Sequence, residues 1–322
     1  MKIAIVYDLK ENYGFDTDSI NYYDFTYLSE VENVRKHLEL AGHKTILINN
    51  LNSFLKILNS RKKVFDLVFN MYEGFKSRNR EGLIPAICES YGIPYTFSDA
   101  FCASFSLHKY QTNCFLEKVG INVPKGFLLT DASKDNLNIK KFPVVLKPNT
   151  QGSSTGLKLV YNQSNLNSSI KEVIKMYGYD ILIEEYIKGI ELSVCILGTG
   201  YDAYVFSVCQ FVDLNYKDII FFDREAKRKD MHFIIEPRIN NNIIKKLCDD
   251  SLLIHRAMNF YDISRIDWRV NRHKNIFLEA TPFPDFAPNT EFEWGAARNG
   301  LDFSFVMNYI VESAMKRNKN ML

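Results

Sequence analysis

The segment RIDWRVNRHKNIFLEAT, residues 265–281, alternates apolar and polar side chains over two short runs. The apolar set falls on even positions: Ile266, Trp268, Val270, Ile276, Leu278 and Ala280. The odd positions on either side of His273 are polar, except for Phe277. Because successive side chains of a strand point to opposite faces of its sheet, this pattern predicts a β-hairpin with one buried face and one polar face.

A symmetric turn in this hairpin places Asp267 opposite Glu279 and Arg265 opposite Thr281. Facing side chains have Cβ atoms about 4.5–5.5 Å apart, so two carboxylates there repel unless a cation or a shared proton lies between them. Oxygen ligands of this kind suit Mg²⁺, which completes its shell with water and phosphate oxygens. The alternative is a solvated acid pair that Arg265 and Arg269 neutralise, and the hairpin alone does not decide between the two.

A second informative segment is VVLKPNTQGSSTG, residues 144–156, in which a buried-strand pattern opens into a loop of small residues. Its only lysine, Lys147, precedes the glycines, whereas the lysine of a Walker phosphate loop follows them. The segment by itself therefore fits two interpretations, a phosphate cradle of another design and an ordinary flexible surface turn.

The composition of the 322 residues is that of a globular protein, with 46% hydrophobic and 24% charged residues. The net charge of +2 gives no reason to expect nucleic acid or a membrane surface as a partner. No window approaches about 18 uninterrupted apolar residues, and the apolar run at residues 3–7 is too short for a signal peptide. The six cysteines include no CxxC pair, which favours reduced thiols in a cytoplasmic protein over disulfides or a zinc site.

The amino-terminal part of the chain alternates strands with helices, which predicts a parallel α/β lobe with right-handed crossovers. We expect a helix over residues 31–41, whose apolar residues recur at helical spacing and which Gly42 ends. Residues 8–29 are polar and aromatic and do not fit the alternation, so we expect a long functional or mobile loop there. The expected strands are residues 2–7, 45–48, 64–69 and 92–96.

From about residue 104 the pattern changes to mixed strands and helices. Helices are expected at residues 109–119, 165–177 and 241–259, and strands at residues 142–147, 181–187, 191–198 and 203–212. A charged loop, residues 213–231, contains the adjacent Phe221 and Phe222, which we interpret as packing residues. A terminal helix is expected to start at Asp302, a residue type that caps helix N-termini well.

Several short motifs follow one another along the chain. The amino-terminal ones are FNMYEG at 69–74, RE at 80–81, PA at 85–86 and GIPYT at 92–96. The later ones are residues 142–156, IEEYIKGIE at 183–191, EAK at 225–227, RID at 265–267 and LEA at 278–280. In this combination the chain resembles the ATP-grasp enzymes, and within them the D-alanine–D-alanine ligase family and its ligase-like relatives. The resemblance spans essentially the whole chain and is weakest at residues 8–29.

The resemblance implies an α/β protein with the ATP-grasp fold, in which a parallel α/β amino-terminal lobe precedes two α+β lobes that hold ATP between them. Three domains are implied. They are a Rossmann-like domain at residues 1–103, a central domain at residues 104–190, and a carboxy-terminal domain with the metal site at residues 191–322. It also implies an amide-forming ligase: ATP phosphorylates a carboxylate, and an amine attacks the acyl phosphate. The implied partners are small carboxylate and amine substrates, amino acids or derivatives of them, and a second copy of the chain in a homodimer.

Individual residues receive roles from the same resemblance. The implied phosphate ligands are Lys109, Lys147 and Lys227, under a lid formed by loop 151–156 with Ser153 and Ser154. The implied adenine slot and ribose acceptor are Glu184, Glu185, Tyr186, Ile187 and Glu191. The implied ligands of Mg²⁺, for which Mn²⁺ is the alternative, are Asp267, Glu279 and Thr281. The implied catalytic groups are Ser153, Lys227 and Arg265, the last as the stabiliser of an oxyanion.

Four positions depart from the family pattern. Thr281 stands in place of an asparagine metal ligand, Arg228 in place of a tyrosine, and Asp285 in place of a glycine at the product end. Residues 8–27 replace the motif whose glutamate holds the first substrate's ammonium, and Glu30 is the suggested counterpart of that glutamate. We therefore expect a ligase other than the housekeeping D-alanine–D-alanine ligase. Two alternatives stay open: a genuine D-alanine–D-alanine ligase with an altered first-substrate site, and a catalytically degenerate ATP-binding protein.

Overall fold

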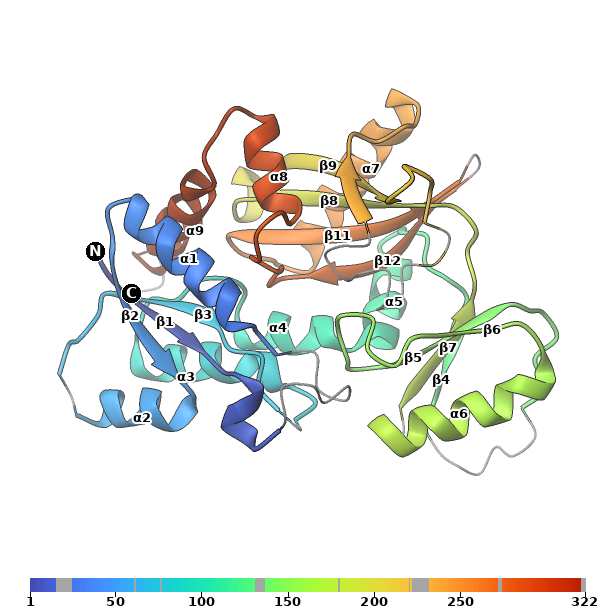
Figure 1. Ribbon diagram of the computed structural model, residues 1–322, viewed down its shortest axis with the longest axis horizontal. Coiled ribbons are helices and arrows are strands. Elements are labelled where there is room, and N and C mark those ends of the chain that lie inside the picture. The colour runs from blue at the N-terminus through green and yellow to red at the C-terminus, as the bar shows by residue number, and fades with distance from the viewer. Residues whose placement is uncertain are drawn as a thin grey trace.

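The computed structural model describes residues 1–15, 25–60, 62–75, 77–130, 137–178, 180–219, 221, 232–271 and 274–319. Figure 1 shows three lobes: a blue amino-terminal lobe, a green central lobe and a yellow-to-red carboxy-terminal lobe. Within the described residues each lobe is built on one sheet, and these sheets have three, four and five strands. The mixed α/β architecture expected from the sequence is confirmed.

The amino-terminal lobe has the parallel sheet predicted for it, in the order β2-β1-β3. Its strands are β1 (Lys2–Tyr7), β2 (Lys44–Asn49) and β3 (Leu67–Met71), and its helices are α1 (Leu28–Leu40), α2 (Leu51–Asn59) and α3 (Leu83–Tyr91). Ile3 and Ile5 of β1 share a core with α1, whereas Ala4 and Val6 share another with Phe54 of α2. Helices therefore cover both faces of the sheet, which explains its nearly uninterrupted apolar strands.

Two expectations for this lobe need correction. The expected strand at residues 92–96 is a single parallel bridge between Tyr95 and Val68. Pro94 has no N–H to donate, and Phe97, with a φ of 71°, turns the chain away, so the pairing stops there. The expected loop at residues 8–29 is shorter than predicted, since Lys10–Tyr13 form a 3₁₀ turn and α1 begins at Leu28. Residues 16–24 lie outside the described residues.

The central lobe is an antiparallel sheet in the order β4-β7-β5-β6, packed against one helix. The strands are β4 (Gly126–Leu129), β5 (Val144–Pro148), β6 (Lys158–Val160) and β7 (Ile181–Glu185), and the helix is α6 (Gln163–Tyr177). Leu146, Val160, Leu166 and Ile183 belong to a core that the other lobes do not share. The two expected strands and the expected helix of this region are confirmed to within a few residues.

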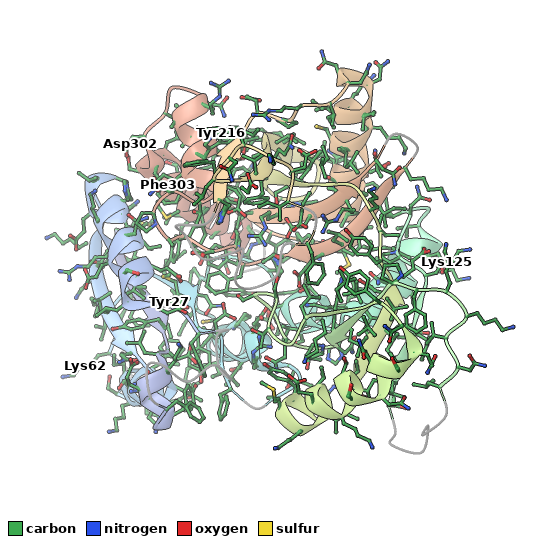
Figure 2. All side chains as sticks on the ribbon, turned by 45° about the vertical axis from the view of Figure 1, so that its right-hand side comes forward. Tyr27, Lys62, Lys125, Tyr216, Asp302 and Phe303 are labelled. Carbon is green, nitrogen blue, oxygen red and sulfur yellow. The ribbon has the colours of Figure 1, made fainter. Side chains whose placement is uncertain are left out.

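The carboxy-terminal lobe has an antiparallel sheet in the order β10-β9-β8-β11-β12. Its strands are β8 (Ile190–Leu197), β9 (Tyr204–Asp213), β10 (His232–Ile235), β11 (Ile263–Val270) and β12 (Asn275–Thr281). Its helices are α7 (Asn241–Ala257), α8 (Glu291–Arg298) and α9 (Phe303–Lys319). Asp302, labelled beside Phe303 in Figure 2, accepts the Ser304 N–H at 2.8 Å, which confirms the predicted cap.

Helix α4 (Ala100–Leu107) lies between the amino-terminal lobe and the central sheet, and α5 (Lys109–Lys118) follows it beside β12 (Figure 1). Leu116 of α5 packs in one core with Trp268 of β11. None of the described helices combines the length and the apolar character needed to cross a membrane. All six cysteines are free thiols, and four of them are buried: Cys88, Cys102, Cys195 and Cys209.

The β11–β12 hairpin has the predicted register at its functional end, since Asp267 faces Glu279 and Arg265 faces Thr281. Beyond these pairs the register shifts by one residue at a β-bulge, and Trp268 faces Phe277. Phe277 is consequently 1% exposed and packs in the core, whereas Leu278 lines a pocket on the other face. The prediction that Leu278 is buried and Phe277 faces the polar side is therefore wrong, because the bulge exchanges their faces.

The bulge makes a measurable difference between two neighbouring substitutions. Phe277→Ala is expected to lower the free energy of unfolding by about 3–5 kcal/mol, because it leaves a cavity in a packed core. Leu278→Ala is expected to cost much less, because its side chain faces the pocket. Urea unfolding of both variants measures the difference, and equal losses would contradict the bulge.

One hydrophobic core joins the amino-terminal and carboxy-terminal lobes. Ile3 and Ile5 of β1 share it with Leu197 of β8, Ile263 of β11 and Val306 of α9. Because the same buried cluster contains strands of both sheets, these two lobes form one packed body, whereas the central lobe has its own core.

Asp262, which is fully buried, links the two lobes by polar contacts as well. It accepts the Phe97 N–H at 2.8 Å and bonds Arg317 Nη2 of α9 at 3.2 Å. The Arg317 guanidinium lies between the rings of Tyr95 and Tyr261, 4.9 and 4.6 Å from their centroids. Burial raises the pKa of the Asp262 carboxyl, although Arg317 counteracts the effect. A buried pair of this kind is costly to break from one side.

Arg317→Ala is expected to lower the free energy of unfolding by about 3–5 kcal/mol, because it leaves the buried Asp262 carboxylate without its cation. The matched control is Lys316→Ala, which breaks an ion pair with Asp202 whose two side chains are 73% and 70% exposed. An exposed pair contributes little, so the control is expected to unfold like the wild type. Similar unfolding curves for both variants would show that Asp262 does not depend on Arg317.

Candidate active site

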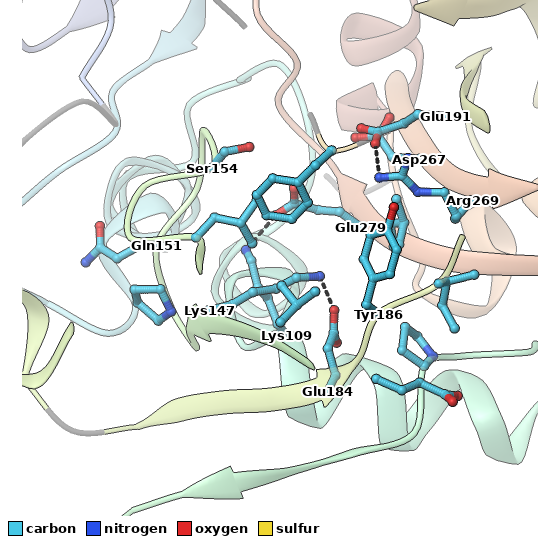
Figure 3. A pocket seen from close by; sticks show the side chains of 18 of the residues that line it. Lys109, Lys147, Gln151, Ser154, Glu184, Tyr186, Glu191, Asp267, Arg269 and Glu279 are labelled. Atoms are coloured by element: carbon cyan, nitrogen blue, oxygen red, sulfur yellow. Dashed lines mark hydrogen bonds and ion pairs between the residues drawn. The ribbon is translucent and has the colours of Figure 1, made fainter. Parts of the chain in front are cut away.

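A pocket with about 790 Å³ of space, partly open to solvent, lies between the central sheet and the β11–β12 hairpin (Figure 3). It gathers predicted residues from five strands, a helix and the loops that follow β5 and β7: Lys109, Lys147, Ser154, Glu184, Glu185, Tyr186, Ile187, Glu191, Asp267 and Glu279. Ser153, Arg265 and Thr281 are not among the residues that line it. Lys227 lies outside the described residues, so its predicted place stays untested.

Lys147 and Glu184 form an ion pair inside the pocket (Figure 3). They come from the neighbouring strands β5 and β7, where Val145 faces Glu184. Glu184 is only 3% exposed, and its Oε2 atom is buried with no hydrogen-bond partner among the described residues. A buried acceptor without a partner is unfavourable, so this oxygen is suited to accept a hydrogen bond from a ligand in the pocket.

The backbone after Glu184 is fixed by short polar contacts. The Tyr186 N–H donates to the Pro143 carbonyl at 3.2 Å, and Glu185 Oε1 accepts the Lys125 N–H at 3.1 Å. The Tyr186 ring lies 6.5 Å from that of Phe221, which also lines the pocket. Phe221 therefore packs, as predicted, and in addition forms part of the pocket wall, while Phe222 lies outside the described residues.

Asn149 ties the start of α5 to the end of β5 and is 2% exposed. Its Oδ1 accepts the Tyr110 N–H at 2.8 Å, and its Nδ2 donates to Gln111 Oε1 at 3.0 Å. Its carbonyl accepts the Lys109 N–H at 3.0 Å. These bonds fix the backbone from which Lys109 projects, so the ammonium groups of Lys109 and Lys147 enter the pocket from two connected elements (Figure 3).

The loop after β5 makes a tight turn at the pocket mouth. Ser153 and Ser154 have φ values of 49° and 55°, and Gly156 has 72°. A Cβ on Gly156 would come within 2.6 Å of Pro148 Cγ, so this position requires glycine. Ser154 lines the pocket, whereas Ser153 is exposed and lies outside its wall. The turn is closed by its own backbone, since the Thr155 N–H donates to the Gly152 carbonyl at 2.9 Å and the Leu157 N–H to the Ser154 carbonyl at 3.2 Å.

Asp267 and Glu279 lie at the other end of the pocket, and each has its own cation. Arg265 donates from Nε to Asp267 Oδ1 and from Nη2 to Asp267 Oδ2, both at 2.9 Å. Lys109 Nζ lies 2.5 Å from Glu279 Oε1. Ser193 Oγ adds a hydrogen bond to Asp267 Oδ1 at 2.6 Å. The repulsion between the facing acids is thus compensated by two cations from different elements.

Arg269 pairs with a different acid from the two hairpin acids that the sequence suggested as its partners. Its Nη2 donates to Glu191 Oε2 at 2.6 Å, and both residues line the pocket. The sequence alternative had both arginines neutralising the hairpin acids. It is right for Arg265, which binds Asp267, and wrong for Arg269, which binds Glu191. Register explains this, since Arg269 faces Glu191 across β11 and β8.

The oxygen donors at the hairpin fit a divalent cation that is bound together with phosphates. Mg²⁺ at nucleotide sites typically takes one or two carboxylates and completes its shell with phosphate oxygens and water. Asp267 and Glu279 supply two such carboxylates. The part of the chain that the structure describes contains no group of three or more His, Cys, Asp or Glu side chains placed to hold a metal. The site suits a metal that arrives with a nucleotide.

The model of the family described as D-ala D-ala ligase C-terminus matches residues 115–312. The chain belongs to the D-alanine–D-alanine ligase family. It is 26% identical over 300 residues to the D-alanine–D-alanine ligase of Fervidobacterium nodosum, covering 88% of this chain and 92% of that one. It is 27% identical over 293 residues to an uncharacterised protein of Sinorhizobium fredii, covering 87% and 85% of the two chains.

Solved structures of this family have the same fold. The crystal structure of D-alanine–D-alanine ligase from Bacillus anthracis superposes with a TM-score of 0.78 at 21% identity and covers 100% of both chains. The same ligase complexed with ATP superposes with a TM-score of 0.76 at 20% identity and covers 99% of both. The ATP-grasp fold expected from the sequence is thereby confirmed.

Two departures from the family pattern concern the predicted metal site and the charged loop 213–231. Thr281, which stands where the family has an asparagine ligand, is half-buried opposite Arg265 and does not line the pocket. Arg228, like Lys227, lies outside the described residues. The predicted role of Thr281 as a metal ligand and the effect of Arg228 in the charged loop 213–231 therefore stay predictions.

Glu291, the first residue of α8, is a site residue that sequence reasoning missed. Arg265 Nη1 donates to Glu291 Oε1 at 3.0 Å, so one guanidinium bridges Asp267 and Glu291. Burial acts to lower the pKa of Arg265, but the charges of Asp267, Glu291 and Glu279 outweigh it and hold that pKa well above its usual range. Arg265 is a permanent cation. An acid in the first turn of a helix was a local signal, but nothing nearby in sequence places that turn beside β11.

Two further acids, Glu30 and Asp285, lie near Tyr27. Burial raises the pKa of Tyr27, and the charges of Glu30 and Asp285 raise it further. Glu30 Oε2 accepts the Tyr27 N–H at 3.4 Å at the start of α1, and Asp285 Oδ1 accepts the Ala287 N–H at 2.6 Å. Both acids thus have local structural contacts, and the suggestion that Glu30 holds a substrate ammonium stays a prediction.

Arg80, part of the RE motif, connects the amino-terminal lobe with the loop after β5. It is 6% exposed, and its Nη1 donates to the Thr150 carbonyl at 3.0 Å. In the sequence analysis this arginine is only one of the motif residues shared with the ligase family, and it has no predicted role. The contact shows that the amino-terminal lobe supports the loop at the pocket mouth.

Proposed function

We propose that this protein is an ATP- and Mg²⁺-dependent ligase that joins a carboxylate to an amine through an acyl phosphate. One observation carries the proposal: a single pocket combines the facing carboxylates of Asp267 and Glu279 with the ammonium groups of Lys109 and Lys147. The cations suit a polyanionic nucleotide, and the acids suit the metal that accompanies it. Membership in the D-alanine–D-alanine ligase family supports the same reaction class.

In the proposed complex, ATP lies along the pocket with its base near the end of β7. Glu184 Oε2 accepts a hydrogen bond from the adenine amino group, and the backbone of Glu185, Tyr186 and Ile187 contacts the purine edge. Glu191 accepts the ribose hydroxyls. The phosphates lie among the groups proposed to bind them: Lys109, Lys147, Lys227, Ser153 and Ser154. The chain has the fold of the Bacillus anthracis ligase that was solved in complex with ATP, which supports ATP as the nucleotide.

Asp267 and Glu279 would hold the magnesium ion, with the Thr281 hydroxyl as a weaker third donor and Mn²⁺ as an alternative metal. Bound there, the metal would neutralise phosphate charge and orient the γ-phosphate. Arg265 keeps Asp267 in place through two hydrogen bonds, and Lys109 contacts Glu279.

The proposed reaction has two steps. A carboxylate oxygen attacks the γ-phosphorus, the bond to the ADP oxygen breaks, and an acyl phosphate forms. The nitrogen lone pair of a deprotonated amine then attacks the acyl carbon, the carbon–oxygen bond to phosphate breaks, and the nitrogen's extra proton leaves. Arg265, as a permanent cation, stabilises the oxyanion of the tetrahedral intermediate. Ser153 and Lys227 are proposed to enclose the reacting phosphate from the loops.

The substrates we propose are amino acids or derivatives of them. A second candidate is that the chain makes D-alanyl-D-alanine, which its relatives named D-alanine–D-alanine ligase favour, including that of Fervidobacterium nodosum. Asp285, an acid in place of a glycine at the product end, favours the first candidate. A homodimer and a cytoplasmic location also belong to the proposal and rest on the family alone.

A panel of carboxylates and amines, scored for ADP release with the product identified by mass, tests the proposed function. D-alanine alone is one arm of the panel, and strong ADP release with it would select the second candidate. ADP release with other pairs supports the main proposal. ATP binding without ADP release for any pair would contradict both and leave the degenerate ATP-binding protein.

Lys147→Met is expected to weaken ATP binding roughly 10- to 100-fold, because it removes a charged contact to the phosphates. The matched control is Lys158→Met on β6, which removes a lysine of the same lobe that pairs with Glu172 away from the pocket. Calorimetric titration with ATP measures both affinities, and circular dichroism checks that each variant is folded. Wild-type affinity in Lys147→Met would refute the phosphate role.

A further inference from the structure

The guanidinium of Arg265 is already balanced by the protein itself. It binds Asp267 with two hydrogen bonds and Glu291 with a third, and the three side chains are only 13%, 10% and 8% exposed. One positive charge therefore stands against two negative charges in a mostly buried cluster. Coulomb interactions are stronger there than in water, and Glu291 occupies Nη1, so a second carboxylate is disfavoured at that edge of the guanidinium.

Glu291 is held in this place by the fold. It is the first residue of α8, where the helix N-terminus favours a negative charge, and the residue as a whole is 6% exposed. The neighbouring Glu293 lies in the same turn but accepts the Asn289 N–H, a different contact from that of Glu291. The helix turn thus carries two acids, of which Glu291 is bound to Arg265.

The other cation at this end of the pocket is engaged in the same way. Lys109 holds Glu279, the acid that faces Asp267 across the hairpin. The charges of three carboxylates, those of Asp267, Glu291 and Glu279, therefore act on Arg265 before any substrate arrives.

Resting on the proposed function, we propose that Glu291 determines the class of amine that the enzyme accepts. Arg265 is proposed to contact the oxyanion at the carbon that the amine attacks, so the acceptor would lie near it. The Glu291 carboxylate occupies the Nη1 edge of Arg265 that a carboxylate of the acceptor could otherwise bind. An acceptor with a carboxylate next to its amino group meets like charges, whereas an amine without one meets an environment that attracts its ammonium. The acceptor is accordingly an amine, or an amino acid whose carboxyl is already an amide, and Glu291 is a specificity-determining residue.

Alaninamide and alanine, each in both enantiomers, form the matched acceptor pair that tests this inference. Alaninamide has no free carboxylate, so the enzyme can use it only as an acceptor. Each is combined with the D and L amino acids as carboxylate donors, and kcat/KM for the acceptor is measured from ADP release. The wild type is expected to prefer alaninamide by about tenfold or more.

Glu291→Gln keeps the shape of the side chain and removes its charge. It is expected to lower the preference for alaninamide about tenfold, mainly through the KM of the acceptor. Because the ratio is compared between variants, the different basicity of the two amines cancels. Glu291→Asp is expected to retain the preference. Glu293→Gln removes the same charge from the same helix turn and is expected to leave the ratio unchanged.

Three results would overturn the inference. A wild-type preference for alanine is one, and an unchanged ratio in Glu291→Gln is another. An equal loss of kcat with both acceptors would show that Glu291 only supports Arg265. ADP release with some pair keeps the proposed function intact in all three cases. No ADP release with any pair would overturn the proposed function, and this inference with it.

Discussion

Two carboxylates face each other across β11 and β12, and the charge that they bring together determines what surrounds them. Asp267 and Glu279 repel one another unless cations compensate them, and Arg265 and Lys109 do so from a strand and a helix. The lysine comes from α5, whose start is bonded to the end of β5, so the compensation connects the hairpin to the central lobe. The same four residues neutralise one another here, and they are the residues proposed to bind ATP, its metal and an oxyanion.

Two of the three lobes are packed into one body, and the central lobe is packed separately. The amino-terminal and carboxy-terminal lobes share a core and the buried Asp262–Arg317 pair, whereas the central lobe has a core of its own. The pocket thus lies between a two-lobed body and a separate lobe. Arg80 reaches from the first body to the loop of the second, so the loop at the pocket mouth is in contact with both. Hydrophobic packing fixes Asp267 and Glu279 on one wall, and the other wall brings Lys147 and Glu184.

Sequence periodicity predicted the features that depend on local spacing. The facing of Asp267 and Glu279 followed from alternation, and it is found because the bulge lies beyond that pair. The exchanged faces of Phe277 and Leu278 could not be predicted, because a bulge depends on the partner strand.

Contacts between residues far apart in the chain could not be predicted from the sequence either. The pairing of Arg265 with Glu291 joins residues 26 positions apart, and that of Arg269 with Glu191 joins residues 78 apart. The predicted roles of Ser153, Thr281 and Lys227 stay open, since the first two do not line the pocket and the third lies outside the described residues. The role of the facing acids is tested most directly by calorimetric titration of ATP with and without Mg²⁺, in the wild type and in Asp267→Asn/Glu279→Gln. If Asp267 and Glu279 hold the metal, Mg²⁺ strengthens ATP binding in the wild type and not in the double variant. An equal effect of Mg²⁺ on both proteins would contradict that role.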